Sequence, residues 1–162
     1  MYKKILLPLD GSELSHQAIP HAIAVATGID AEVALIQVID SVVQIISETT
    51  PATIEPIPSG ELTVEIAESA VAAQREAAQA NLDAATAQIV AGGIEAARIT
   101  TEVVEGNASQ SIENAVERLS SDLVIIATHG RSGIKRLLLG SVADHVARNT
   151  PTAAVLLIRP SS

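Results

Sequence analysis

Five short aliphatic runs recur along the chain, and longer segments with helical periodicity separate them. The runs span residues 5–9, 33–39, 98–104, 123–127 and 154–158. Three of the runs are almost continuously apolar, which is typical of parallel strands buried on both faces. Strand and helix therefore alternate, and this alternation predicts one α/β domain over residues 1–162, with a parallel sheet and right-handed crossovers.

Four segments are predicted to be helical. They span residues 13–27, 65–91, 108–119 and about 141–148. Pro20 lies inside the first segment and should kink that helix or delay its start, because proline lacks the N–H that a helix interior needs. Asn107 or Ser109 is the expected cap of the third helix.

The segment 65–91 carries a stripe of mostly small apolar residues at alternating spacings of four and three. The stripe comprises Ile66, Ala70, Ala73, Ala77, Ala80, Ala84 and Ala87. We expect this face to lie close against the sheet, since an alanine coiled-coil seam, the alternative, would be weak. Gly92 and Gly93 should end the helix.

Residues 40–64 interrupt the alternation of strand and helix segments, and they contain three prolines and several serines and threonines. The composition predicts a surface loop. Loops of that length are uncommon and are usually functional or mobile.

Composition narrows the function classes. Hydrophobic residues make up 48% of the 162 residues, Phe and Trp are absent, and Tyr2 is the single aromatic residue. Single-stranded nucleic acid therefore lacks its usual stacking platform, and a net charge of −9 argues against phosphate-backbone contacts. Without cysteine there is no disulfide and no thiolate metal site.

Neither a signal peptide nor a membrane span is expected. The N-terminal apolar run is only five residues long, and no run approaches the roughly 18 apolar residues that cross a bilayer. We therefore expect the protein in the cytoplasm and away from membranes.

Two strand ends carry unusual sequences. Residues 8–12, PLDGS, place a carboxylate after the first strand, and Gly140-Ser141 precede the last helix, where backbone N–H groups can face an anion. Between Gly130 and Gly140, three cations lie within residues 131–136, in a stretch from 123 to 143 that has no carboxylate. This chemistry suits a phosphate cradle, although the cations could simply be solvated. Neither a Walker A loop nor a G-x-G-x-x-G fingerprint is present.

Four segments together resemble the universal stress protein family over nearly the whole chain: KKILLPLDGSELSHQAI, VALIQVID, DLVIIATHGRSGIKRLLLGSVADHV and TPTAAVLLIRP. The ATP-binding branch of that family has the pattern G-x2-G-x9-G-[ST]. The matching positions here are Ala127, Gly130, Gly140 and Ser141, so alanine replaces the first glycine.

The resemblance implies a Rossmann-like fold of the adenine nucleotide alpha hydrolase type, an open five-stranded parallel sheet of order 3-2-1-4-5 with helices on both faces. It also implies ATP as ligand, held with Mg²⁺. Asp10 would face the ribose or metal side with Pro8 and Leu9 beside it, and Val38 would hold the adenine. The residues implied at the phosphates are Gly130, Gly140, Ser141 and Val142, with Ala127 beside them.

In function, the resemblance implies an ATP-binding regulatory or sensing module of the stress response, with at most very slow ATP hydrolysis. It also implies a homodimer through the C-terminal strand. Two alternatives stay open: a family member that binds no nucleotide and acts only through protein contacts, and an enzyme of adenylate chemistry.

Overall fold

Five parallel strands form one open sheet in the computed structural model, which describes residues 2–49, 60–128 and 139–159. The strands are β1 (Lys4–Leu9), β2 (Glu32–Ile39), β3 (Ile99–Glu105), β4 (Leu123–Ala127) and β5 (Ala154–Ile158). Their order across the sheet is β3-β2-β1-β4-β5, and each neighbouring pair is parallel. The predicted fold class and strand order are confirmed.

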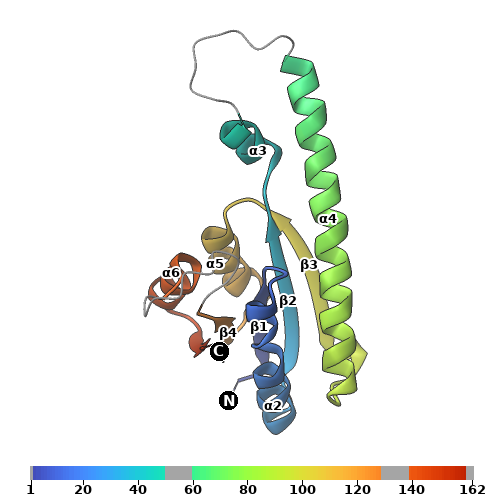
Figure 1. Ribbon diagram of the computed structural model, residues 1–162. Helices are drawn as coiled ribbons and strands as arrows, with labels where there is room; N and C mark the ends of the chain where they lie inside the picture. Colours follow the sequence, from blue (N-terminus) through green and yellow to red (C-terminus); the bar gives the residue numbers. More distant parts are fainter. Residues whose placement is uncertain (1, 50–59, 129–138, 160–162) are drawn as a thin grey trace.

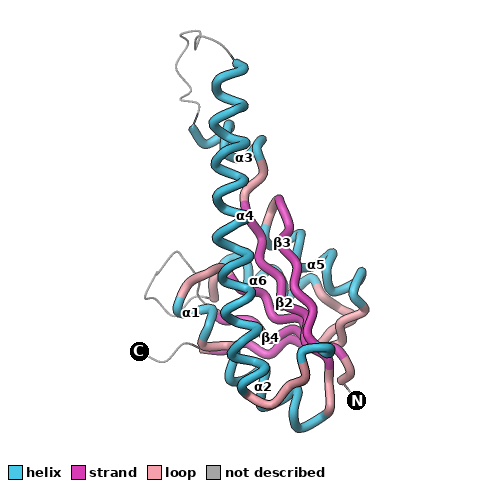
Figure 2. Tube along the Cα trace, turned by 90° about the vertical axis from the view of Figure 1, so that its right-hand side faces the viewer, coloured by secondary structure: helices cyan, strands magenta, loops and turns pink. Residues whose placement is uncertain are grey.

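Helices cover both faces of this sheet (Figures 1 and 2). The helices are α1 (Glu13–His16), α2 (Ile19–Ile29), α3 (Val42–Thr49), α4 (Gly60–Ala91), α5 (Ala108–Leu119) and α6 (Ser141–Asn149), with a 3-10 turn at Ala96–Arg98. α2 and α4 pack on the face that carries Leu7 and Leu35, and α5 and α6 pack on the face that carries Leu6 and Ile36. The chain therefore has two aliphatic cores, one on each side of the sheet.

The burial of each strand follows its place in the sheet. β1 and β4 are buried from Ile5 to Leu9 and from Leu123 to Ala127, and both are nearly continuous apolar runs. The edge strand β3 reads ITTEVVE and is partly exposed along its length. At the other edge, Leu156 of β5 is 37% exposed. The runs of β1 and β4 are buried as expected for strands of a parallel sheet covered on both faces, whereas β5 is an equally apolar run at an edge.

Pro20 divides the first predicted helix. α1 ends at His16, α2 begins at Ile19, and Pro20 lies in the first turn of α2, where its missing N–H has no helical partner to lose. The segment thus starts at Glu13 as predicted, but it is divided into two helices before Pro20 instead of being kinked or delayed. Asn107, one of the two expected caps of α5, accepts a hydrogen bond from the backbone N–H of Gln110 at 3.2 Å.

The end of α4 was predicted correctly, but the predicted buried stripe on this helix is wrong. Ala73, Ala77, Ala80, Ala84 and Ala87 are exposed, Ala70 is partly buried, and Ile66 is 61% exposed. The buried stripe starts one residue later and comprises Ala67, Val71, Ala78, Leu82, Ala85 and Ile89. This face carries the branched side chains, and burying such a side chain stabilises the fold far more than burying a methyl group.

The structure also differs from the loop predicted at 40–64. Residues 42–49 form α3, α4 already begins at Gly60, and residues 50–59 lie outside the described residues. Ser41 and Gln44 explain α3: the backbone N–H of Ser41 donates to Oε1 of Gln44 at 2.8 Å, and the N–H of Gln44 donates to Oγ of Ser41 at 3.4 Å. This reciprocal pair is a capping box, and its S-x-x-Q signature is visible in the sequence.

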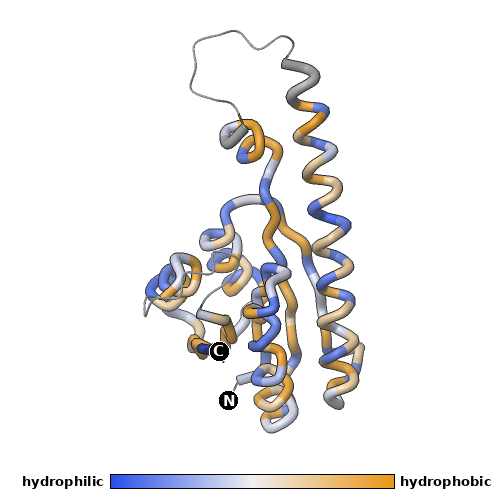
Figure 3. The backbone as a smooth tube through the Cα atoms, viewed as in Figure 1, coloured by the Kyte–Doolittle hydropathy of each residue, from blue (hydrophilic) through white to orange (hydrophobic). Residues whose placement is uncertain are grey.

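α3 and the first half of α4 extend beyond the carboxyl ends of β2 and β3 (Figure 1). Val42 and Ile45 of α3 pack with Val71 and Ala78 of α4, next to Ile39 at the end of β2. Figure 3 shows α3 as mostly hydrophobic, whereas α4 alternates between polar and apolar residues along its length. The two helices thus form a small third core beside the strand ends.

The corrected stripe on α4 can be tested by stability. Leu82→Ala should lower the free energy of unfolding by roughly 2–5 kcal/mol, because it removes a fully buried side chain and leaves a cavity. Ala80→Gln, on the face that the sequence pattern favoured, should change it by no more than about 0.5 kcal/mol. Urea unfolding followed by circular dichroism measures both, and equal losses would contradict the assignment of the faces.

Candidate functional site

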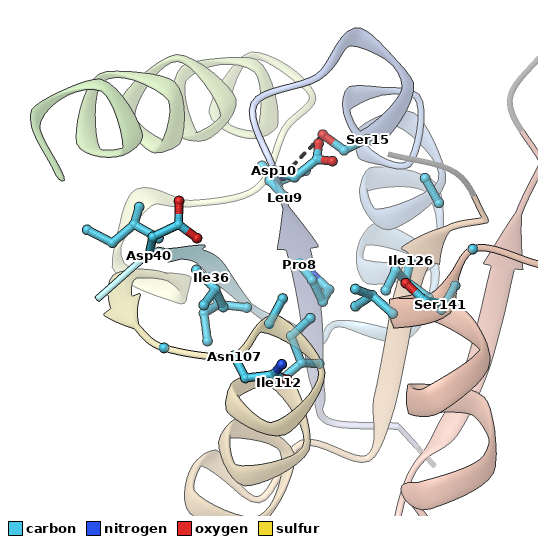
Figure 4. Close-up of a pocket in the computed structure, with 18 of the residues that line it drawn as sticks. Pro8, Leu9, Asp10, Ser15, Ile36, Asp40, Asn107, Ile112, Ile126 and Ser141 are labelled. Atoms are coloured by element: carbon cyan, nitrogen blue, oxygen red, sulfur yellow. Dashed lines mark hydrogen bonds between the residues drawn. The ribbon is translucent and has the colours of Figure 1, made fainter. Parts of the chain in front are cut away.

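A cavity of about 360 Å³ opens at the carboxyl ends of β1, β2 and β4 (Figure 4). β1 lies between β2 and β4, and the strand order reverses there, since β2 and β3 follow on one side of β1 and the chain then crosses to place β4 and β5 on the other. Ligands in open parallel sheets bind at such a reversal. The cavity therefore occupies the place where this fold offers a binding site.

Eight of the nine site residues that the sequence predicted line this one cavity. They are Pro8, Leu9, Asp10, Val38, Ala127, Gly140, Ser141 and Val142. Gly130 and the three cations of residues 131–136 lie outside the described residues. The structure thus brings the eight residues together, and their binding of a nucleotide stays a prediction.

One wall of the cavity is aliphatic. Pro8 of β1, Ile36 and Val38 of β2 and Ile126 of β4 contribute to it, and Ile112 of α5 joins them. Alternate residues of a strand point to the same face, so these four strand residues share the side of the sheet that α5 covers. A flat apolar ring could lie against this wall.

The start of α6 supplies the opposite end of the cavity. Gly140 is its N-cap, and the backbone N–H of Gly140 donates to the carbonyl oxygen of Thr128 at 2.8 Å. Within the described residues, the N–H groups of Ser141, Val142 and Ala143 have no hydrogen-bond partner, and no side chain caps the helix. These N–H groups and the helix dipole make this end suited to an anion.

Gly140 itself does not need glycine for its backbone angles. Its φ of −60° and ψ of 150° suit any residue. Glycine is therefore not required here for the shape of the turn.

Asp10 stands at the tip of β1 and is fixed by the loop that follows it. Its Oδ1 accepts hydrogen bonds from the backbone N–H of Ser12 at 2.9 Å and from the Ser12 hydroxyl at 2.6 Å. Gly11 between them has a φ of +79°, which favours glycine, and it permits this tight turn. The carboxylate is thus held at the rim of the cavity.

Several residues that line the cavity were not predicted as site residues from the sequence. Asp40 follows β2 as Asp10 follows β1, and Gly106 and Asn107 follow β3, so the rule of strand ends could have found all three. Gln44 lies in α3, which was predicted as loop. Figure 4 places Asp40 and Ile36 on one side of Pro8, and Ser141 and Ile126 on the other.

Two further features bear on what the site could hold. Among the described residues, no three His, Cys, Asp or Glu side chains gather in a way that could bind a metal ion. Across the same parts of the chain, no helix has both the length and the apolar character needed to cross a membrane.

Comparison with known proteins assigns the family. The sequence pattern of the universal stress protein family matches residues 1–159. The chain belongs to this family. Universal stress protein MJ0531 of Methanocaldococcus jannaschii is 33% identical over 161 residues, which are 99% of this chain and 84% of that protein.

Solved structures agree with the fold. The structure of hypothetical protein MJ0577, from the same organism, has a TM-score of 0.79 at 26% identity and covers 100% of this chain and 99% of its own. A universal stress protein in complex with cAMP has a TM-score of 0.65 at 22% identity over 99% of this chain and 98% of its own, and it shares the fold.

Ala127 is where this universal stress protein departs from the ATP-binding pattern of the family. It ends β4, pairs with Ile158 of β5, is 8% exposed and is one of the residues that line the cavity.

Proposed function

We propose that this cavity binds ATP and that the protein is a regulatory or sensing module of the stress response in the cytoplasm, with little or no turnover. The observation that carries the proposal is the open first turn of α6, whose N–H groups line the same cavity as an aliphatic wall. The N–H groups of α6 suit phosphates, and the aliphatic wall suits a purine ring. The relative solved with cAMP supports an adenine nucleotide as the ligand class.

Magnesium is proposed to enter with the triphosphate. In nucleotide sites, Mg²⁺ is usually bound by phosphate oxygens together with one or two carboxylates. Asp10 is the carboxylate that the family resemblance places on the ribose or metal side. The phosphate oxygens would therefore supply most of the ligands of Mg²⁺, and Asp10 would be the carboxylate beside them.

Wild-type protein, stripped of bound nucleotide, should bind ATP in the presence of magnesium, whereas Gly140→Val should show no detectable binding. The branched side chain would occupy the space in front of the N–H groups of α6. Ala127→Gly should bind ATP as tightly as the wild type or more tightly. Isothermal titration calorimetry measures all three affinities.

Gly28→Val is the matched control, because a Cβ added at Gly28 meets no atom within 4 Å. It should keep the wild-type affinity. Unchanged binding by Gly140→Val would place the phosphates elsewhere.

A second candidate is a family member that binds no nucleotide and works through an unidentified protein partner. The alanine at position 127, where the ATP-binding pattern has glycine, favours it. No heat from the wild type, with binding restored only in Ala127→Gly, would support this candidate.

ATP hydrolysis by the purified protein should be far slower than the roughly 1–100 per second typical of kinases. Hydrolysis needs a base or a water-orienting residue near the γ-phosphate. Among the described lining residues, the carboxylates are Asp10, whose Oδ1 is engaged by Ser12, and Asp40, at the far end from Ser141. A coupled phosphate-release assay measures the rate, and kinase-like turnover would contradict the sensing role.

We also propose a homodimer through β5. This strand forms an open sheet edge, and Leu156 is 37% exposed on it. Multi-angle light scattering at micromolar concentration should give the mass of two chains, and Leu156→Glu should shift it toward one. A monomeric wild type would refute the proposal.

A further inference from the structure

A second cavity, of about 310 Å³, lies on the opposite side of the sheet from the cavity that α6 borders. Gln37 of β2 and Asn81 of α4 line it, on the face of the sheet that α4 covers (Figure 2). Ile36 and Val38, whose side chains alternate with that of Gln37 along β2, line the first cavity instead. The volume of the second cavity is at the lower end of the range for small-molecule sites.

The side chain of Gln37 is buried but is not fully paired. It is 8% exposed, and its Oε1 accepts a hydrogen bond from Nδ2 of Asn81 at 2.6 Å. Within the described residues, Nε2 of Gln37 donates to no group, and yet the one fully buried side-chain polar atom without a partner is Oγ of Ser121. Nε2 of Gln37 therefore keeps a small exposed surface. Gln37 lines the second cavity and not the first, so this surface faces the second cavity.

Gly11 confirms where this nitrogen lies. A Cβ added at Gly11 would lie 3.6 Å from Nε2 of Gln37, and Gly11 lines the same cavity. The cavity thus contains an amide donor that is nine-tenths buried and awaits an acceptor.

Two further amides, those of Gln74 and Asn81, line the cavity, and their oxygens are engaged. Oε1 of Gln74 accepts from the backbone N–H of Asp40 at 3.1 Å, and Oδ1 of Asn81 lies 2.6 Å from Nε2 of His16. Each amide nitrogen carries two N–H groups, and among the described residues the nitrogens of Gln74 and Asn81 each make one hydrogen bond. The three amides of the cavity therefore offer more donors than acceptors.

The charge of the lining restricts the ligand further. Asp10 brings a carboxylate, and no lysine or arginine is among the described residues that line the cavity, so an anion would be repelled. The uncommitted N–H groups disfavour an ammonium group in the same way. A neutral ligand with several hydroxyl groups suits both, because each hydroxyl accepts from an amide N–H and donates to a carboxylate or to the hydroxyl of Ser12.

We propose that the second cavity binds a small neutral polyhydroxy compound, a polyol or a monosaccharide, and that Nε2 of Gln37 donates to one of its hydroxyl oxygens. A polar group that is buried without a partner is costly, and a ligand that completes its hydrogen bonding removes that cost. Asn81 is the positioning residue, since it holds Oε1 of Gln37. The inference does not depend on the binding of ATP.

Titration of the nucleotide-free wild type with glycerol, myo-inositol and D-glucose tests the proposal. A nitrogen–proton correlation spectrum observes the side-chain amides of Gln37 and Asn81 and the backbone N–H of Gly11 directly. At least one of the three compounds should shift these signals in a saturable way. D-Glucuronate, in which a carboxylate replaces the hydroxymethyl group of glucose, should bind roughly tenfold more weakly than the best of the three, because Asp10 repels it.

Two variants locate the binding. Ala77→Leu should abolish the shifts, because Ala77 lines the cavity at an exposed position of α4, where a longer side chain fills the cavity without disturbing the core. Ala80→Leu is the matched control, since Ala80 is exposed on the same helix and lines neither cavity, and it should bind like the wild type. Gln37→Glu keeps the oxygen that Asn81 contacts but removes the donor, and should weaken binding by about tenfold or more.

Several results would overturn the proposal. They are the absence of a saturable shift with all three neutral compounds, tighter binding of D-glucuronate than of any of them, and shifts that persist in Ala77→Leu. Unchanged binding by Gln37→Glu, with its fold verified by thermal unfolding, would do the same. Ala77→Leu and Ala80→Leu change exposed positions, so their comparison decides the matter even where Gln37→Glu fails to fold.

Discussion

The burial of β1 between β2 and β4 is the constraint on which the rest of the structure depends. Ile5, Leu6 and Leu7 are fully buried, so both faces of this strand must be covered by helices. The chain passes from β1 to β2 and β3 on one side and then crosses to β4 and β5 on the other, so the strand order reverses at β1. The cavity lies at this reversal. A packing requirement of the core thus places the site beside Pro8 and Asp10.

α4 links this site to the part of the fold that extends beyond the sheet. Gln74 and Asn81 are partly buried amides beside its apolar stripe. Gln74 is hydrogen-bonded to Asp40. The side-chain amide of Asn81 donates to Oε1 of Gln37 at 2.6 Å, and Gln37 is 8% exposed. The side-chain oxygen of Asn81 lies 2.6 Å from Nε2 of His16. Buried amides are costly unless they are paired, so these contacts fix the register of α4 against the tips of β1 and β2. Any movement of α4 along its axis would disturb Asp40.

The sequence predicted strands better than helix faces, and the reasons are physical. LVIIA of β4 and AVLLI of β5 are short apolar runs between turns, and their bounds were predicted to the residue. In α4, alanines occur on several faces, so the most regular alanine stripe was not the buried one; only the larger Val71, Leu82 and Ile89 mark the core. Asp10, Gly140 and Ser141 could be located by their strand or helix ends. Asp40 follows β2 and could have been found by the same rule, whereas Gln44 depends on α3, whose capping box was not recognised in the sequence.

The charges around the cavity also set the direction in which a nucleotide could lie. The chain carries a net charge of −9, so a triphosphate needs a local environment that opposes the overall repulsion. The start of α6 provides one, since it presents backbone N–H groups, and its first-turn acid, Asp144, is paired with Arg148 at 2.9 Å. Asp40 lies at the opposite end and Asp10 on the rim between. Carboxylates there repel phosphates but accept hydrogen bonds from a base or a ribose. The N–H groups of α6 would therefore hold the phosphates, and the carboxylates of Asp10 and Asp40 would disfavour a nucleotide bound with its phosphates at their end.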